Sequence, residues 1–212
     1  GEALFFYLAL EDIRHAADLF RRIHHRTCGV DGFVSLEVSP LLAHDTHATI
    51  EVARELHARA ARPNVFIKIP GTPRGLPAIE ETIFAGVPVN VTLLFSREQY
   101  LSAAEACLRG IERRIAAGLR PDVASVASLF ISRWDAAVAA EVPEGLRNQL
   151  GIAIGKRTYK AYVELMASPR WQRALNAGAR VQRLLMASTG TKDPKAPDTL
   201  YVQGLAAPQT VN

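Results

Sequence analysis

The sequence has few cysteines and no long apolar run. Cys28 and Cys107 are the two cysteines of the 212-residue chain, and they stand far apart without the spacing of a metal site. The chain therefore offers no disulfide framework and no zinc cluster, and a reducing cytoplasm is the expected compartment. No run approaches the roughly 18–20 apolar residues that span a bilayer. Ala3–Leu10 is shorter and lacks a basic leader and a cleavage pattern, so we expect neither a signal peptide nor a membrane anchor.

A strong excess of one charge is also absent. The chain has 25 Lys and Arg against 21 Asp and Glu, a net charge of +4. Its basic residues occur in short pairs such as Arg21-Arg22 and Arg113-Arg114, which is typical of solvated helix faces rather than of a nucleic-acid interface. We expect no nucleic-acid partner. With 49% hydrophobic residues and no low-complexity segment, residues 1–212 are expected to form one soluble globular domain.

The sequence does contain two alternating hydrophobic patterns. Short aliphatic runs repeat every second residue, as in strands, and the segments between them repeat with the period of a helix. The predicted helices are Asp12–Arg26, Asp45–Ala61, Pro77–Gly86, Glu98–Gly118 with Ser96 as its cap, and a region from about Pro143 to Ala177 broken near Ser168-Pro169. The six predicted strands are Asp31–Pro40, Val65–Ile69, Pro88–Phe95, Asp122–Arg133, Gln182–Thr189 and Thr199–Pro208. This alternation indicates parallel β/α units, either in a doubly wound sheet or in a (β/α)8 barrel.

The faces of the predicted strands favour the barrel. One face of each strand is aliphatic, with Val34, Leu36 and Val38; Val65, Ile67 and Ile69; Val89, Val91, Leu93 and Phe95. The other face turns polar toward its carboxyl end, with Ser35 and Glu37; Phe66 and Lys68; Asn90, Thr92 and Leu94; and Ser128 and Ser188 near the ends of two more strands. A barrel opens onto its active site at the carboxyl ends of its strands, whereas an open sheet between two helix layers would not need five strands to turn polar together.

Lys68 lies inside the apolar run Val65–Ile69, although an unpaired buried ammonium is costly. Two interpretations are open. Lys68 can be structural, extending to solvent or pairing with Glu37. Alternatively, its neutral amine can attack a ketone to form a Schiff base, which acts as an electron sink for cleaving the neighbouring carbon–carbon bond. The polar face that Lys68 shares with Glu37, Asn90 and Thr92 favours the second interpretation, because a carboxylate can relay protons there.

Four motifs in this order resemble those of the transaldolase family: IKIPGT (67–72), VNVTLLFS (89–96), VASLFISRWD (126–135) and ASTGTKDP (187–194). The similarity runs from Asp31–Pro40 to Asp198–Asn212 and points to the bacterial and plant-type variant, which includes fusions to glucose-6-phosphate isomerase. It implies a (β/α)8 TIM barrel, here incomplete with strands 3–8, and no metal or organic cofactor. It also implies a transferase of the non-oxidative pentose phosphate pathway. The reaction converts sedoheptulose 7-phosphate and glyceraldehyde 3-phosphate into erythrose 4-phosphate and fructose 6-phosphate by moving a dihydroxyacetone unit.

The resemblance also implies roles for individual residues. Lys68 matches the Schiff-base lysine, and Glu37 and Thr92 match the pair that holds the catalytic water. The matched substrate-binding residues are Asn90, Ser128, Phe130, Arg133 for the phosphate, and Ser188. Some relatives carry an arginine after the seventh strand, where this chain offers Lys192 as a second phosphate ligand.

The sequence departs from the family at its beginning, where the aspartate of the first strand and the asparagine of the second have no counterpart. We therefore expect a segment of a longer transaldolase, poorly soluble and nearly inactive by itself, with Phe33–Val38 and Leu200–Gln203 as unpaired sheet edges. Three alternatives remain. The first is a lyase like fructose-6-phosphate aldolase, which releases free dihydroxyacetone. The others are a non-catalytic fragment that binds sugar phosphate and a purely structural piece of a fused enzyme. Trp134 and Trp171 are expected to be packing residues.

Overall fold

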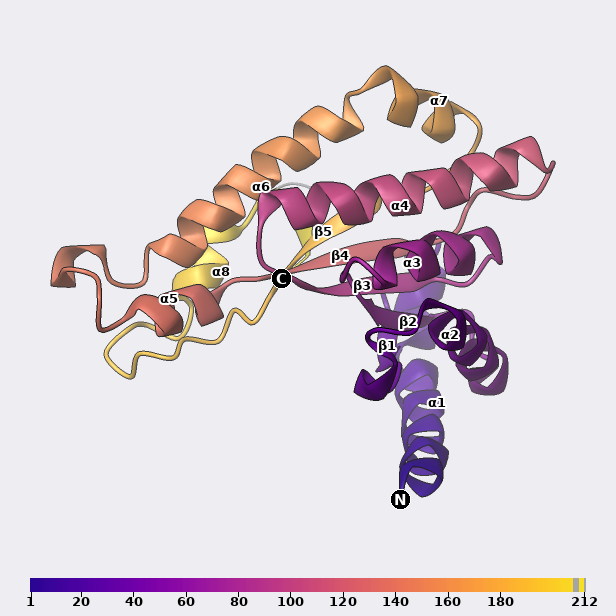
Figure 1. Ribbon diagram of the computed structural model, residues 1–212, viewed down its shortest axis with the longest axis horizontal. Coiled ribbons are helices and arrows are strands. Elements are labelled where there is room, and N and C mark those ends of the chain that lie inside the picture. The colour runs from indigo at the N-terminus through magenta and orange to yellow at the C-terminus, as the bar shows by residue number, and fades with distance from the viewer. Residues whose placement is uncertain (208–209, 212) are drawn as a thin grey trace.

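Six strands form one parallel sheet in a computed structural model of the chain, which describes residues 1–207 and 210–211 (Figure 1). The strands lie side by side in chain order. They are β1 (Val34–Glu37), β2 (Val65–Pro70), β3 (Val89–Leu94), β4 (Ser125–Phe130), β5 (Gln182–Ala187) and the two-residue β6 (Thr210–Val211). Each pair of neighbouring strands is parallel, so the predicted β/α fold class is confirmed.

Helices connect consecutive strands and pack against one another along the outer face of the sheet (Figure 1). The long helices are α1 (Glu2–Arg26), α2 (Thr46–Ala60), α3 (Gly75–Phe84), α4 (Arg97–Ala116), α6 (Leu150–Met166) and α7 (Pro169–Asn176). The short ones are η1 (Pro40–Leu42), α5 (Ser132–Val138), η2 (Glu144–Leu146) and α8 (Leu200–Leu205). In the part of the chain that the structure describes, no helix combines the length and the apolar character needed to cross a bilayer.

Side-chain caps set several helix starts where the sequence predicted them. Asp45 accepts a hydrogen bond from the Ala48 amide at 2.9 Å, and Ser96 accepts one from the Gln99 amide at 3.1 Å. These contacts satisfy backbone N–H groups that have no partner inside the helix. The long helical region is broken at Ser168, as predicted, because Ser168 caps α7.

The aliphatic strand faces build the core against the helix layer, as predicted. The outward side chains of β2 to β5 are almost completely buried; among them are Val65, Ile67, Ile69, Val89, Val91, Ala127, Leu129, Leu184 and Met186. They pack in one cluster with side chains of α4 and α7, including Tyr100, Ile111 and Trp171. Burying a large apolar side chain stabilises the fold by about 1.5–3 kcal/mol, so this layer holds the sheet in shape.

Several predicted boundaries differ in the structure. For example, β1 spans Val34–Glu37 rather than Asp31–Pro40, and the first α-helix of the region predicted from Pro143 begins at Leu150. The first helix begins at Glu2 rather than Asp12, so the apolar run Ala3–Leu10 is helical. The third begins at Gly75 rather than Pro77. The predicted strand Asp122–Arg133 is shorter, because β4 ends at Phe130 and Arg133 lies in the first turn of α5.

The prediction of a last strand at Thr199–Pro208 is wrong. Leu200–Leu205 forms α8, and β6 follows at Thr210–Val211, while Pro208 lies outside the described residues. Tyr201 and Leu205 are four residues apart and both buried, which is the spacing of one helix face. A short apolar run fits either a strand or a helix by its pattern alone, and here packing on the neighbouring helix decides. The predicted sheet edge at Leu200–Gln203 is therefore wrong as well.

A bulge in β3 changes which side chains face inward. Val91 pairs with Ala127, but Leu94 pairs with Leu129, so β3 carries one extra residue at this point. Leu93 has a φ of 58°, in the left-handed region. Because side chains alternate along a strand, the extra residue reverses the faces beyond it. Leu94 is fully buried in the outer core beside Val91, so the prediction that it shares the face of Thr92 is wrong. The prediction that Leu93 lies on the aliphatic outer face is wrong as well, because Leu93 is 37% exposed.

The sheet is strongly curved. One cavity of about 170 Å³ is lined by residues from each of the first five strands: Ser35, Phe66, Asn90, Val126 and Leu185. Five flat strands would extend over about 19 Å between the first and the fifth. In addition, Arg183 of β5 donates hydrogen bonds to the Asp31 carboxylate, at 3.0 Å, and to the Val30 carbonyl, both just before β1. The inner faces of β1 and β5 therefore approach each other across a concave surface.

The contact between α3 and α4 generates a stability prediction. A β-carbon at Gly110 would lie 2.7 Å from the Glu80 carbonyl oxygen and 2.8 Å from the Ile83 Cγ2 atom. Gly110→Ala should therefore lower the free energy of unfolding by about 1–2 kcal/mol, because overpacking outweighs the better helix propensity of alanine. The matched control is Gly145→Ala, whose β-carbon would meet nothing within 4 Å. Urea unfolding of both variants measures the difference, and equal stability would contradict the prediction.

Candidate active site

Glu37, Lys68 and Asn90 lie side by side on the inner face of the sheet. The parallel register pairs Glu37 with Lys68 and Lys68 with Asn90. The Lys68 ammonium nitrogen lies 3.0 Å from a Glu37 carboxylate oxygen. The Lys68 side chain is 26% exposed and that of Glu37 is 44% exposed, so both remain accessible to a ligand. A lysine with a carboxylate within hydrogen-bond distance can exchange a proton directly with it.

A hydrogen-bond chain orients the Asn90 amide. Ser128 of β4 donates to the Asn90 side-chain oxygen at 2.7 Å, and the Asn90 amide nitrogen donates to the Ser35 hydroxyl at 3.1 Å. Asn90 and Ser128 are buried, whereas Ser35 is exposed. The amide therefore cannot rotate without losing a buried hydrogen bond, and its position next to Lys68 is fixed by strands on both sides.

Thr92 lies one pair farther along β3, opposite Pro70 of β2. It is completely buried, and its hydroxyl has no hydrogen-bond partner in the part of the chain that the structure describes. Buried hydroxyls are normally paired, so this unpaired one, one residue pair beyond Lys68 and Asn90, is a candidate ligand for water or substrate. Thr92 immediately precedes Leu93, so the β3 bulge lies next to the Thr92 end of the candidate site.

An aromatic stack supports the guanidinium of Arg133, which lies just after β4. The Arg133 guanidinium carbon lies 4.8 Å from the centroid of the Phe130 ring, and the Phe95 ring stacks on Phe130 with centroids 5.3 Å apart. Phe95 was predicted on the aliphatic outer face, and this prediction is wrong because the β3 bulge turns it toward Phe130. Arg133 itself is exposed, so its guanidinium can bind an anion.

Ser188 and Lys192, which were both predicted to bind substrate, have different surroundings. Ser188 has a φ of 56°, and its hydroxyl lies 3.0 Å from that of Ser132, next to Arg133 in the chain. Its carbonyl accepts a hydrogen bond from the Ser132 amide. Lys192 instead lines a cavity of about 460 Å³ with Arg147, a cation that the sequence motifs did not reveal. The structure thus joins Ser188 to the beginning of α5 and places Lys192 in a cavity lined by α5, α8 and the η2–α6 connection.

Asp135 fixes the helices behind Arg133. Its carboxylate accepts hydrogen bonds from the amides of Leu150 and Gly151, at 2.9 and 3.0 Å, and from the Tyr201 hydroxyl at 2.9 Å. Burial, together with this carboxylate, raises the pKa of the Tyr201 hydroxyl above its usual value. Asp135 therefore joins α5, α6 and α8, and all of its contacts are structural.

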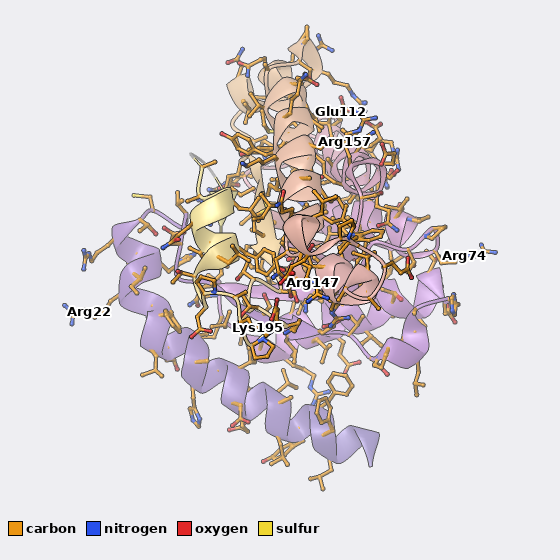
Figure 2. All side chains as sticks on the ribbon, turned by 90° about the vertical axis from the view of Figure 1, so that its left-hand side faces the viewer. Arg22, Arg74, Glu112, Arg147, Arg157 and Lys195 are labelled. Carbon is orange, nitrogen blue, oxygen red and sulfur yellow. The ribbon has the colours of Figure 1, made fainter. Side chains whose placement is uncertain are left out.

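The part of the chain that the structure describes offers no metal cluster. Within the described ranges, no group of three or more His, Cys, Asp and Glu side chains could hold a metal ion. Figure 2 shows the basic side chains of Arg22, Arg74 and Arg157 in widely separated parts of the molecule.

The Asn90 chain generates a testable prediction. Ser128→Ala should lower the free energy of unfolding by about 1–3 kcal/mol, because it leaves the buried Asn90 oxygen without a donor. Ser35→Ala is the matched control, and we expect a change within about 0.5 kcal/mol because water can replace this exposed hydroxyl. Urea unfolding distinguishes the two variants, and equal effects would mean that the hydrogen bonds from Ser128 and to Ser35 do not hold Asn90 in place.

Comparisons with known proteins identify the family. The model of the family described as Transaldolase/Fructose-6-phosphate aldolase matches residues 1–211. Transaldolase from Parafrankia sp. (strain EAN1pec) is 48% identical over 209 residues, which cover 95% of this chain and 57% of the relative. Transaldolase from Thermobifida fusca (strain YX) is 49% identical with the same coverage. Transaldolase 2 from Nostoc punctiforme is 44% identical over 223 residues, 97% of this chain and 58% of the relative. This chain thus spans little more than half the length of these relatives. It belongs to the transaldolase/fructose-6-phosphate aldolase family.

Proposed function

We propose that this chain carries the catalytic centre of a transaldolase, which transfers a dihydroxyacetone unit between sugar phosphates through a Schiff base on Lys68. The observation that carries the proposal is the row Glu37, Lys68 and Asn90 on the inner face of the sheet. Family membership and the names of the relatives support the general activity. Because the chain spans 57% of the Parafrankia relative, the activity of the whole relative is part of the proposal.

The proposed architecture is a (β/α)8 barrel in which β1 to β6 are strands 3–8. Three observations support it: the strands follow one another in chain order, the helices cover the outer face, and the inner face is concave. In such barrels, catalytic side chains gather at the carboxyl ends of the strands. Glu37 is the last residue of β1, and Lys68 and Thr92 lie near the ends of β2 and β3.

In the proposed mechanism, the ion pair at 3.0 Å is the resting state, and Glu37 accepts a proton from Lys68 to free the amine. The amine attacks the ketone carbon of the donor sugar, and loss of water leaves a protonated imine. Cleavage of the next carbon–carbon bond sends its electron pair into the imine and releases the aldose phosphate, while the hydroxyl on the cleaved carbon gives its proton to a base. The family resemblance assigns this base to the first-strand aspartate, which has no counterpart in this chain. The remaining enamine attacks the aldehyde of the acceptor, and water finally hydrolyses the imine. Glu37 and the free hydroxyl of Thr92 hold this water.

Binding of the sugar phosphates is assigned to the remaining predicted residues. Asn90 and Ser128 bind substrate hydroxyls, and the exposed Arg133 binds the phosphate with its planar fork of donors. Phe130 supports Arg133, and Ser188 lies beside the same helix start. Lys192 is proposed as a second phosphate ligand. The reaction as proposed uses no metal or organic cofactor and takes place in the cytoplasm.

The nucleophile is tested by trapping. Borohydride reduction with fructose 6-phosphate should leave an adduct on Lys68, located by peptide mass spectrometry, and Lys68→Ala should abolish it. The matched control is Lys160→Ala, since this lysine lies on α6 and is 79% exposed. The chain should be tested both as it stands and joined to the segments of the Parafrankia relative that lie outside the aligned residues. An adduct on another lysine in both forms would overturn the assignment.

The phosphate site is tested by comparing substrates. Arg133→Ala should raise the KM for fructose 6-phosphate roughly 10- to 100-fold, because charge-assisted hydrogen bonds contribute about 1.5–3 kcal/mol. The concentration of unphosphorylated dihydroxyacetone that half-saturates adduct formation should stay unchanged. Arg157→Ala is the control, because Arg157 is a highly exposed arginine on α6. Equal losses for both ligands would make Arg133 structural.

A lyase is the second candidate, because the family description itself includes fructose-6-phosphate aldolase. Both enzymes would form the adduct on Lys68. A transferase passes the three-carbon unit to an added aldose phosphate, whereas a lyase releases dihydroxyacetone without an acceptor. Product analysis with and without glyceraldehyde 3-phosphate therefore separates them. Tight sugar-phosphate binding with neither product would instead indicate a non-catalytic binding segment.

A further inference from the structure

Trp134 follows Arg133 directly in the first turn of α5, yet its side chain belongs to a contact with β3. The indole N–H donates a hydrogen bond to the Phe95 carbonyl at 2.8 Å. The Trp134 ring also meets the Phe95 ring edge-to-face, with centroids 6.4 Å apart and an interplanar angle of 77°. Trp134 is half-buried. The sequence predicted only a packing role for it, and a packing role alone does not account for a directed hydrogen bond to the end of a neighbouring strand.

The contact has a structural cause in the β3 bulge. The extra residue at Leu93 turns Leu94 outward and Phe95 inward, so Phe95 leaves the ladder next to β4. Its amide donates to the Gln99 side chain at 2.7 Å, and its carbonyl accepts from Trp134. The end of β3 is thus held by one side chain from its own helix and by one from the helix after β4.

These contacts connect Trp134 to the guanidinium of Arg133. The Phe95 ring lies between Trp134 and Phe130, and Arg133 rests on Phe130. On the other side, the Ser132 amide and hydroxyl bind Ser188 at the end of β5. The first turn of α5 is therefore attached to both neighbouring strand ends, through Trp134 to β3 and through Ser132 to β5. An arginine side chain loses substantial rotamer freedom when it binds, so prior orientation improves its affinity for phosphate.

We propose that Trp134 is a positioning residue of the sugar-phosphate site, which holds the first turn of α5 against the end of β3 and thereby orients Arg133. The proposal rests on the function proposed above for Arg133. Trp134 does not touch the substrate; it acts through the Phe95 carbonyl and through the stack of Phe95 and Phe130. Because it lies at the phosphate end of the site, it affects phosphorylated ligands and not the chemistry at Lys68.

The test is Trp134→Phe, which keeps an aromatic ring and removes the N–H donor. The concentration of fructose 6-phosphate that half-saturates the borohydride adduct should rise roughly three- to tenfold, the effect expected from losing one hydrogen bond. The value for dihydroxyacetone, which has no phosphate, should not change. Trp171→Phe is the matched control: it makes the same chemical change in a fully buried tryptophan of α7 whose N–H has no hydrogen-bond partner among the described residues. Trp171→Phe should leave the ratio of the two values unchanged.

Binding of inorganic phosphate, measured by calorimetry, provides a readout that does not depend on the Schiff base. Its Kd should rise by the same factor in Trp134→Phe and stay constant in Trp171→Phe. If an adduct forms on Lys68 and Trp134→Phe does not change the preference for the phosphorylated ligand, the positioning role is overturned and the proposed function stays intact. The absence of an adduct together with a Trp134-dependent phosphate affinity would reject only the Schiff base. A parent chain that binds no phosphate would overturn the positioning role.

Discussion

The pairing register of β1, β2 and β3 is the constraint on which the candidate site depends. It places Glu37, Lys68 and Asn90 in one row on the inner face. Side chains alternate along a strand, so a shift of one residue in β2 would send Lys68 into the helix layer and a core isoleucine into the site. The buried outer side chains Ile67 and Ile69 prevent this shift, because exposing either one would remove about 1.5–3 kcal/mol of burial energy. The apolar outer face thus fixes the chemistry of the inner face.

Departures from regular strand geometry occur at the carboxyl end of the sheet, where the candidate site lies. The bulge at Leu93 and the left-handed backbone of Ser188 both follow residues of the inner face. A left-handed backbone costs a non-glycine residue roughly 1–2 kcal/mol, so both conformations must be held by the contacts around them. At β3 this irregularity turns Phe95 toward Phe130, and at β5 it brings Ser188 to the start of α5. The strained residues therefore bring together strand ends that regular strands would leave apart.

The scaffold beneath the site is stabilised by packing more than by its many ion pairs. Arg170 of α7 binds both Glu105 and Glu112 of α4, with the shortest contacts at 2.7 Å, and these carboxylates hold the pKa of Arg170 above its usual value. These side chains are 37–40% exposed, however, and exposed pairs contribute about 0–1 kcal/mol each. The close approach of α3 and α4 at Gly110 and the apolar cluster under α4 contribute more. The ion pairs chiefly fix which helix faces meet.

Local patterns in the sequence predicted the parallel β/α order, the helix starts at Asp45 and Ser96, the helix break near Ser168 and the inward faces of β1 and β2. These features depend on local periodicity and on side chains close in the chain, so pattern alone was sufficient. The tertiary structure decided the rest. The run at Leu200–Leu205 became a helix because Tyr201 and Leu205 are buried on one helix face, and no local signal marked this. The faces on which Leu94 and Phe95 lie depend on the register of β3 against β4. Counting alternate residues along β3 cannot reveal this register, because the bulge forms only when the two strands pair. The hydrogen bond from Trp134 to Phe95 joins residues 39 positions apart, and the pairing of β3 with β4 brings them together.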